Sequence, residues 1–186
     1  TVRNELEKSV QERTAELNKT NSKLERESAY VQLHKDIAIA ANETIGLKDT
    51  LKVCLEKICA HANWPVGHVY LVPNQTSNWL EPAKVWFLEN PSRFDTFRKI
   101  SEATPFGPGM GLPGRVLISK QPEWIIDVTK DTNFPRAKLA KNIGVKAGFA
   151  FPLLIGKQVV GVMEFFSTEV EEPNKDLMKV MAEVGV

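Results

Sequence analysis

The chain has 186 residues, 42% of them hydrophobic, which is enough for one sizeable core with an appendage and excludes a disordered tail. Its 24 Lys and Arg residues balance 23 Asp and Glu, so the formal charge of +1 provides no field to attract nucleic acid or an anionic membrane surface. The two cysteines are too few for a disulfide framework and fit a reducing cytoplasm.

The sequence predicts neither a membrane span nor a signal peptide. The most apolar segment, residues 148–166, is divided by Gly156-Lys157-Gln158 and by Glu164 into two halves of strand length. The first ten residues, TVRNELEKSV, lack the apolar run of a signal peptide. Because the chain begins at Thr1 and not at Met, we expect it to be part of a longer protein.

The first part of the chain is predicted to form a long coiled-coil helix. Residues 1–45 contain no Gly or Pro, and apolar side chains recur every seven residues while the alternate seam position is polar. Polar layers weaken a coiled coil, and an Asn in the seam favours a parallel pair. A solitary amphipathic helix packed on its own domain is the alternative. The predicted dimer interface consists of Val10, Thr14, Leu17, Asn21, Leu24, Ser28 and Val31.

After a break near Gly46, the periodicity alternates between that of a helix and that of a strand. The order predicts an α+β fold with a mostly antiparallel sheet of five to six strands and flanking helices. The last helix should begin after Asn174, a suitable N-cap, and we expect it to be cut short. Helices are predicted at 47–64, 94–101, 115–121, 134–144 and 174–186, and strands at 67–72, 83–89, 123–127, 148–155 and 159–166.

The stretch GMGLPG at 109–114 has the G-x-G-x-x-G spacing of a dinucleotide-binding turn, and the acid Asp127 follows. The surrounding sequence argues against that function. The preceding residues, SEATPFGP, contain two prolines and no buried strand, and no βαβ series surrounds the stretch. We therefore interpret residues 103–114 as a surface loop, shaped by Gly and Pro, that turns back over the sheet as ligand lids often do.

Four motifs together resemble the GAF family of small-molecule sensor domains. They are GLPGRV at 111–116, W-x-x-D-V at 124–128, D-x-x-F-P-R-A at 131–137 and GFAFPLLIGKQVVGVMEFF at 148–166. In addition, VQERTAELNKTNSKLERE at 10–27 is similar to the signalling helix that joins sensory and catalytic modules in histidine kinases. The resemblance implies a GAF-like domain at 37–186 preceded by a coiled-coil signalling helix at 1–36. Helices on one face of its sheet would dimerise, and loops on the other face would enclose a pocket.

The function that the resemblance implies is that of a cytoplasmic regulatory module in a two-component phosphorelay. A parallel homodimer would relay a small-molecule ligand or an upstream input to a downstream kinase or output domain of the same chain. We expect no enzyme activity from these residues themselves, because the sequence has no phosphoacceptor-histidine box, ATP-binding glycine motif or acidic receiver site. The cofactor is unknown; covalent bilin attachment is disfavoured because no cysteine follows Cys59.

A ligand pocket needs aromatic walls and a few fixed polar groups. Arg136 would hold an anionic group bidentately, with a surface arginine as the alternative. The histidines lack metal-ligand spacing, and a haem ligand at His68 remains an alternative to an ordinary packed histidine. The predicted ligand-binding residues are Met110 in the covering loop, the aromatic Trp124, Phe134, Phe149 and Phe151, and the polar Asp127 and Arg136.

Two other functional classes remain open at this point. One is a GAF-fold reductase of a small oxidised metabolite that would use Cys54 or Cys59, although both residues are expected to be small core side chains. The other is a ligand-free dimerisation spacer whose pocket is filled by its own aromatic side chains. Cyclic-nucleotide binding is disfavoured because the F-x-x-x-D-E element of such GAF domains is missing.

Overall fold

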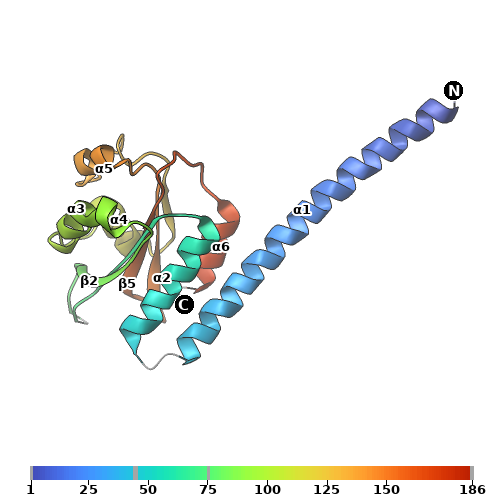
Figure 1. Ribbon diagram of the computed structural model, residues 1–186. Coiled ribbons are helices and arrows are strands. Elements are labelled where there is room, and N and C mark those ends of the chain that lie inside the picture. The colour runs from blue at the N-terminus through green and yellow to red at the C-terminus, as the bar shows by residue number, and fades with distance from the viewer. Residues whose placement is uncertain (1, 44–45, 75, 185–186) are drawn as a thin grey trace.

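A computed structural model describes residues 2–43, 46–74 and 76–184 of the chain (Figure 1). The last two residues of the predicted final helix, 185 and 186, lie outside this description. In chain order, the elements are α1 (Val2–Glu43), α2 (Leu47–Ala62), β1 (Val66–Leu71), β2 (Glu81–Leu88), α3 (Pro91–Glu102), α4 (Gly111–Ser119), β3 (Glu123–Ile125), α5 (Ala137–Ile143), β4 (Gly148–Ile155), β5 (Gln158–Phe166) and α6 (Lys175–Val184).

The described strands form one antiparallel sheet of five strands, in the order β2-β1-β5-β4-β3. The predicted α+β fold is thus confirmed. The predicted hairpin of β4 and β5 lies at the centre of the sheet, and its turn contains Gly156 with a φ of 61°, which glycine adopts without strain. Because helices cover both faces, these two strands are apolar on both sides, as their sequences indicated.

Each face of the sheet has its own core and its own helices (Figure 1). Helices α1, α2 and α6 cover one face, which we call the helix-bundle face. Helices α3, α4 and α5 cover the other, which we call the enclosed face. Alternation along β5 divides its side chains between them: Met163 and Phe165 belong to the helix-bundle core, whereas Val162 and Phe166 belong to the core of the enclosed face.

Local signals account for where three of the helices begin or end. The Asn90 side chain accepts a hydrogen bond from the backbone nitrogen of Arg93 at 3.0 Å, which caps α3, and Pro91 occupies its first turn. Asn174 caps α6 in the same way through the backbone nitrogen of Leu177, as predicted. Helix α5 ends at Ile143, and the following Gly144 caps it with a φ of 78°.

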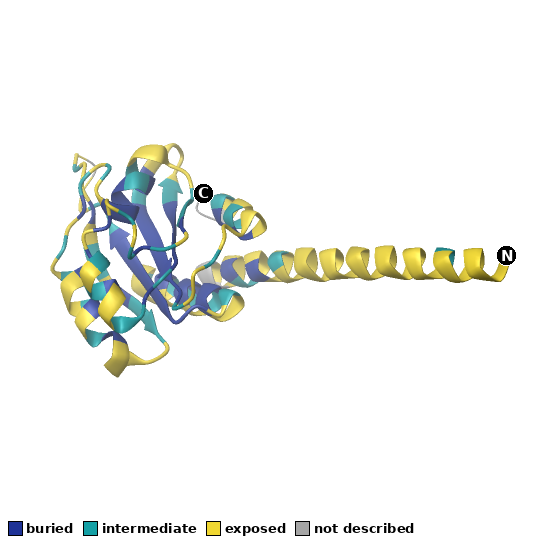
Figure 2. Ribbon diagram, turned by 90° about the horizontal axis from the view of Figure 1, so that it is seen from above, coloured by how far each residue is buried: buried dark blue, intermediate teal, exposed yellow. Residues whose placement is uncertain are grey.

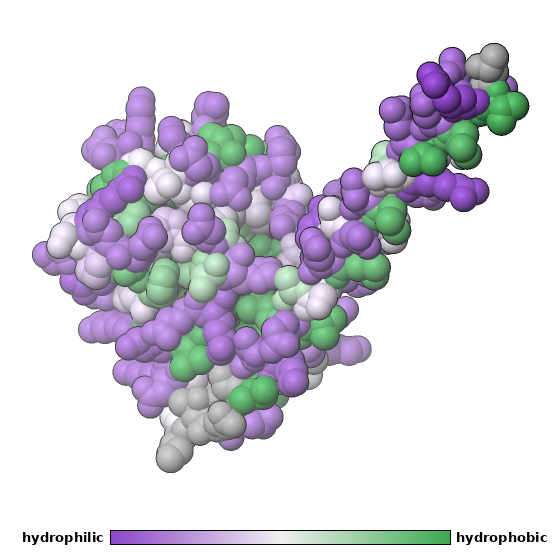
Figure 3. Space-filling model, turned by 45° about the vertical axis from the view of Figure 1, so that its right-hand side comes forward, coloured by the Kyte–Doolittle hydropathy of each residue, from purple (hydrophilic) through white to green (hydrophobic). Residues whose placement is uncertain are grey.

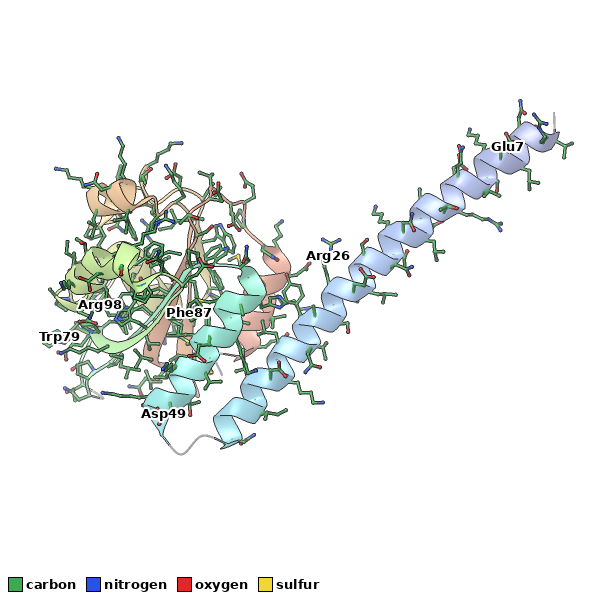
Figure 4. The ribbon with its side chains drawn as sticks, in the orientation of Figure 1. Glu7, Arg26, Asp49, Trp79, Phe87 and Arg98 are labelled. Atoms are coloured by element: carbon green, nitrogen blue, oxygen red, sulfur yellow. The ribbon has the colours of Figure 1, made fainter. Side chains whose placement is uncertain are left out.

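Helix α1 projects far beyond the domain and is exposed over most of its length (Figure 2). It continues without interruption past residue 36 to Glu43. Near its C-terminal end, Leu33 and Ile37 are buried in the helix-bundle core, and the Tyr30 hydroxyl bonds to the Asn174 side chain. Upstream of Tyr30, side chains such as Glu7 extend into open space (Figure 4). No helix in the described part of the chain is long and apolar enough to cross a membrane.

The predicted loop at residues 103–114 is helical only in its last four residues, since 103–110 lie between α3 and α4. Gly111 and Gly114 lie in the first turn of α4, which begins four residues earlier than the sequence indicated. Gly111 has a φ of 60°, and a Cβ there would meet the ring of Phe106 at 2.7 Å. Because neither glycine has a Cβ, the tight turn can continue directly into α4 while packing closely against Phe106 and Gly107.

Candidate functional site

Strand pairing places a row of polar and aromatic side chains across the enclosed face. His68 on β1 lies opposite Trp86 on β2 and opposite Glu164 on β5. Because paired residues in antiparallel strands point to the same face, these three side chains are neighbours. The His68 ring stacks on the Trp86 ring with centroids 3.8 Å apart, and its Nδ1 lies 3.4 Å from Glu164 Oε1.

Arg136, just before α5, completes a buried polar cluster that we define as His68, Ser101, Arg136 and Glu164. Its guanidinium donates two parallel hydrogen bonds to the Glu164 carboxylate, Nη1 to Oε1 and Nη2 to Oε2, each of 2.8 Å. A third bond of 2.8 Å runs from Nη1 to the hydroxyl of Ser101 on α3. All four side chains of the cluster are at most 2% exposed. The pair is bidentate and shielded from water, which is the strong form of this interaction.

Four phenylalanines surround the guanidinium, and we call them the aromatic cage. The distances from Arg136 Cζ to the four ring centroids lie between 5.0 and 5.3 Å. That distance is within the range of cation–π attraction, which strengthens when water is excluded. The cage consists of Phe97 on α3, Phe106 and Phe134 in loops, and Phe166 on β5.

The charges in the cluster follow from burial and pairing. Burial alone would raise the pKa of the Glu164 carboxyl, but Arg136 and the hydrogen bonds outweigh it and hold that pKa at about 2. Burial lowers the pKa of the His68 imidazole, and the nearby Glu164 only partly opposes this. At neutral pH the cluster therefore holds one cation, one anion and a neutral imidazole.

The loop that carries Arg136 is attached to the glycine-rich turn at the surface. Asn133 donates a hydrogen bond to the Gly109 carbonyl at 2.8 Å and accepts one from the Gly111 backbone nitrogen at 3.1 Å. Arg115 on α4 pairs with Asp131 and bonds to the Asn133 carbonyl. The glycine-rich stretch thus holds the loop that inserts Arg136, a role that its G-x-G-x-x-G spacing did not indicate.

Gly114 should be the most sensitive position in this attachment. A Cβ at Gly114 would lie 2.2 Å from the Gly107 carbonyl oxygen, a contact that only a backbone shift could relieve. We expect Gly114→Ala to reduce the free energy of unfolding by about 1–3 kcal/mol in urea denaturation, as overpacking does elsewhere. Gly107→Ala is the matched control, because nothing lies within 4 Å of its added Cβ. Equal stabilities of the two variants would contradict this account.

The seven predicted ligand-binding residues do not line one pocket. Phe149 and Phe151 face the helix-bundle core, on the side of the sheet opposite Phe134 and Arg136. Their prediction as pocket walls is corrected here, because alternation along β4 gives both the same face and the sequence did not identify which. Met110 is 39% exposed on the turn before α4.

Trp124 and Asp127 lie at a different place again, along an open surface hollow that they share with Arg115 and Asp131. Asp127 accepts bonds from the backbone nitrogen and hydroxyl of Thr129, and this local turn lowers the pKa of its carboxyl. Its side chain therefore stabilises its own loop. Of the predicted residues, only Phe134 and Arg136 belong to the buried polar cluster and its cage.

Both cysteines lie on α2 in the helix-bundle core, across the sheet from the buried polar cluster. Burial raises the pKa of the Cys54 and Cys59 thiols, so neither is activated as a thiolate near neutral pH. His68 is likewise packed, between Trp86 and the edge of the Tyr70 ring.

Sequence reasoning missed Glu164, the acidic centre of the cluster. A signal was present, because an acid between Met163 and Phe165 in an otherwise apolar central strand must be buried with a partner. The sequence predicts Arg136 as a polar residue that binds a ligand, whereas in the structure it binds Glu164. His68 and Ser101 carried no comparable signal, since both residue types are common in cores and on surfaces.

Comparison with protein families and solved structures supplies the evolutionary context. The family model described as GAF domain matches residues 44–185. A comparison with curated proteins found no match. A GAF domain of A. aeolicus in an inactive state superimposes with a TM-score of 0.66 at 16% identity, covering 86% of this chain and 93% of that one.

Two further structures have similar scores. The GAF domain of a phosphoenolpyruvate-protein phosphotransferase from Coxiella burnetii has a TM-score of 0.69 at 10% identity, covering 86% of this chain and 89% of that one. Free methionine-R-sulfoxide reductase from Neisseria meningitidis, in complex with its substrate, has a TM-score of 0.63 at 14% identity, covering 84% and 81%. At these identities the likeness concerns the fold, which regulatory domains and reductases share.

Proposed function

Because this chain belongs to the GAF domain family, we propose that it is a dimeric regulatory module whose helix α1 carries the signal. In this proposal the chain works in a two-component phosphorelay of the histidine kinase type, in the cytoplasm. It binds a small molecule or receives an upstream input and passes the change to a downstream output domain.

The observation that carries the proposal is the apolar stripe along α1, which we define as Val10, Leu17, Leu24 and Val31. These side chains are between 55 and 69% exposed in the single chain. Figure 3 shows hydrophobic side chains following one side of the projecting helix. In an α-helix, Leu33 lies about 200° round the axis from Val31, so the stripe lies on the side of α1 opposite Leu33, and only its Val31 end borders a surface hollow beside α6. A second α1 would cover it.

A route from the enclosed face to α1 supports the signalling role. Glu164 points into the buried polar cluster, while its neighbours Met163 and Phe165 point into the helix-bundle core. Leu33 and Ile37 of α1 belong to the same core. A shift of β5 that follows a change at the cluster would therefore reach α1 through packed side chains. Such coupling requires that the ligand bind two arrangements with different affinities.

Other features favour a regulatory function over a catalytic one. They also support a cytoplasmic location. The thiols that a reductase would need are buried on the face opposite the cluster. Two free cysteines fit a reducing compartment. The histidine kinase context rests on the similarity of residues 10–27 to signalling helices.

Native mass spectrometry of the freshly purified chain, compared with the denatured sample, tests the proposal in one experiment. We expect a dimer, and an additional retained mass would identify the ligand. A clean monomer would overturn the dimeric module. A dimer without added mass would favour the second candidate, a ligand-free spacer, which Arg136 supports because it already fills the aromatic cage.

The polar seam of α1 should limit the stability of the dimer. Replacing Thr14, Asn21 and Ser28 by Ile or Leu should tighten self-association at least about tenfold and fix the output of the parent protein in one state. Sedimentation equilibrium measures the first effect and a kinase assay of the parent protein the second. Glu12→Leu with Lys19→Leu is the matched control, about 200° round the helix from Val10 and Leu17. Unchanged association and output in the seam variant would refute a register mechanism.

A further inference from the structure

Resting on the proposed function, we propose that the buried polar cluster and its aromatic cage form a receptor for a small organic cation, an alkylguanidinium or alkylammonium. Arg136 is the internal occupant of that receptor. A ligand of the same chemistry binds by taking the place of the Arg136 guanidinium.

The walls of the receptor are those that select a cation. The Glu164 carboxylate presents both oxygens to the occupant, and Ser101 adds a hydroxyl oxygen. The faces of the aromatic cage supply the remaining contacts, at centroid distances between 5.0 and 5.3 Å. A carboxylate combined with several aromatic rings and no competing cation attracts a guanidinium or ammonium, and it repels an anion.

Most of the receptor does not depend on the segment that fills it. Glu164 and Phe166 are on β5, and Phe97 and Ser101 are on α3. Only Phe134 belongs to the same loop as Arg136. If Arg136 withdrew, the carboxylate, the hydroxyl and three of the four rings would keep their places.

Arg136 is inserted from a surface loop. Along residues 133–136, burial alternates: Asn133 and Pro135 are exposed, while Phe134 and Arg136 are buried. The bonds from Arg93 to the Ile143 carbonyl and from Asn133 to the Gly109 carbonyl are exposed to water, which can replace them, and the bond from the Gly111 nitrogen to Asn133 is only part-buried. Releasing the loop therefore leaves the sheet intact.

The occupant is also incompletely satisfied. Among the described residues, the buried Arg136 Nε finds no hydrogen-bond partner, and neither does His68 Nε2. A buried donor without a partner weakens the structure that holds it. A free ligand cation, unlike the tethered side chain, can turn so that its donors meet the oxygens of Glu164 and Ser101 with better geometry.

Nuclear magnetic resonance of the ¹⁵N-labelled chain tests displacement directly through the Nε–H signal of Arg136, assigned by its absence in Arg136→Lys. Titration with methylguanidinium should move this signal saturably toward that of a solvent-exposed arginine, at low-millimolar concentration. N-methylurea, the neutral isostere, should have no such effect at equal concentration. Glu164→Gln should weaken the response at least tenfold.

Arg136→Ala provides a second measurement. Methylguanidinium should raise the thermal midpoint of this variant more than that of the wild type, because the receptor is then vacant. If methylguanidinium raised the thermal midpoint of Arg136→Ala but left the Nε–H signal of the wild type unchanged, the proposal would be overturned. The Arg136–Glu164 ion pair would then be a structural interaction that a ligand does not displace. Absence of binding in both proteins would overturn it as well.

The same samples distinguish this proposal from the dimeric module. Native mass spectrometry reports the oligomeric state without reference to the cation. A monomer that binds methylguanidinium would overturn the dimer and support the receptor. A dimer that does not bind methylguanidinium would support the dimeric module and overturn the receptor.

Discussion

Arg136→Met should destabilise the folded chain by about 3–5 kcal/mol, because the Glu164 carboxylate would be buried without its cation. The wild-type pair is at most 2% exposed and joined by two hydrogen bonds of 2.8 Å, so solvent cannot substitute for the missing guanidinium. For a chain of this size, the loss corresponds to roughly 6–20 °C in the thermal midpoint. Urea denaturation with an unchanged m value would measure it.

The pH dependence of the same variant gives a second, opposite signature. In the wild type, pairing holds the pKa of Glu164 at about 2, so its stabilisation is fully present above the unfolded pKa of about 4.5 and is lost as the pH falls toward 2. In Arg136→Met, burial without a cation should raise that pKa, so stability should fall as the pH rises. The difference between the two proteins should widen between about pH 3 and about pH 7.

Two controls separate charge from packing. Arg136→Met combined with Glu164→Leu should recover most of the lost stability, because replacing a buried ion pair by apolar side chains is often neutral. Glu164→Gln removes the carboxyl, so the free energy of unfolding of this variant should lack the decrease at acidic pH that Glu164 contributes in the wild type. If the free energy of unfolding of Arg136→Met followed the same pH dependence as that of the wild type, Glu164 would not be a buried charge that Arg136 neutralises.

Leu17→Glu with Leu24→Glu should weaken the proposed dimer at least about 100-fold, because like charges would face each other across the seam of a parallel pair. Leu17 and Leu24 are 60 and 57% exposed in the single chain, so the domain itself should remain folded. Sedimentation velocity would show dissociation. Circular dichroism should show reduced helix content, since an isolated helix lacking a partner is marginal in water.

The matched control reverses charge on the opposite side of the same helix. Lys19→Glu with Arg26→Glu introduces the same number of acidic side chains outside the seam, and Figure 4 shows Arg26 on the side of α1 that faces the domain, opposite the apolar stripe. This control should remain dimeric. A dimer that survives the Leu17→Glu and Leu24→Glu substitutions would place the interface elsewhere, on α2 or α6.

Elements defined by local patterns could be predicted from the sequence. The β4–β5 hairpin follows from two apolar runs around a Gly-Lys turn, and α2 follows from helical spacing that ends before Pro65. The five-stranded sheet was within the predicted range. Bounds were less well predicted where packing decides them, as at Gly111, which became helical because Phe106 and Asn133 close the turn over it.

The candidate site was predicted less well because its geometry is not local. The spacing of Phe149 and Phe151 shows that they share a face but does not show which helices cover it. Arg136 and Glu164 lie 28 residues apart in the sequence and meet only because β5 is central and the loop before α5 folds over it. A buried acid in a central strand requires a cation, so Glu164 and Arg136 could have been proposed as partners from the sequence.

The attachment of α1 at one end makes it a lever. Its contacts with the domain begin near Tyr30, so the preceding residues form an arm of roughly 40 Å. A tilt of about 5° at Leu33 and Ile37 would move the far end of that arm by roughly 3–4 Å, because displacement grows with distance along a straight rod. Movements too small to disturb the domain core would thus become a change of several ångströms in the separation between the far ends of two paired α1 helices.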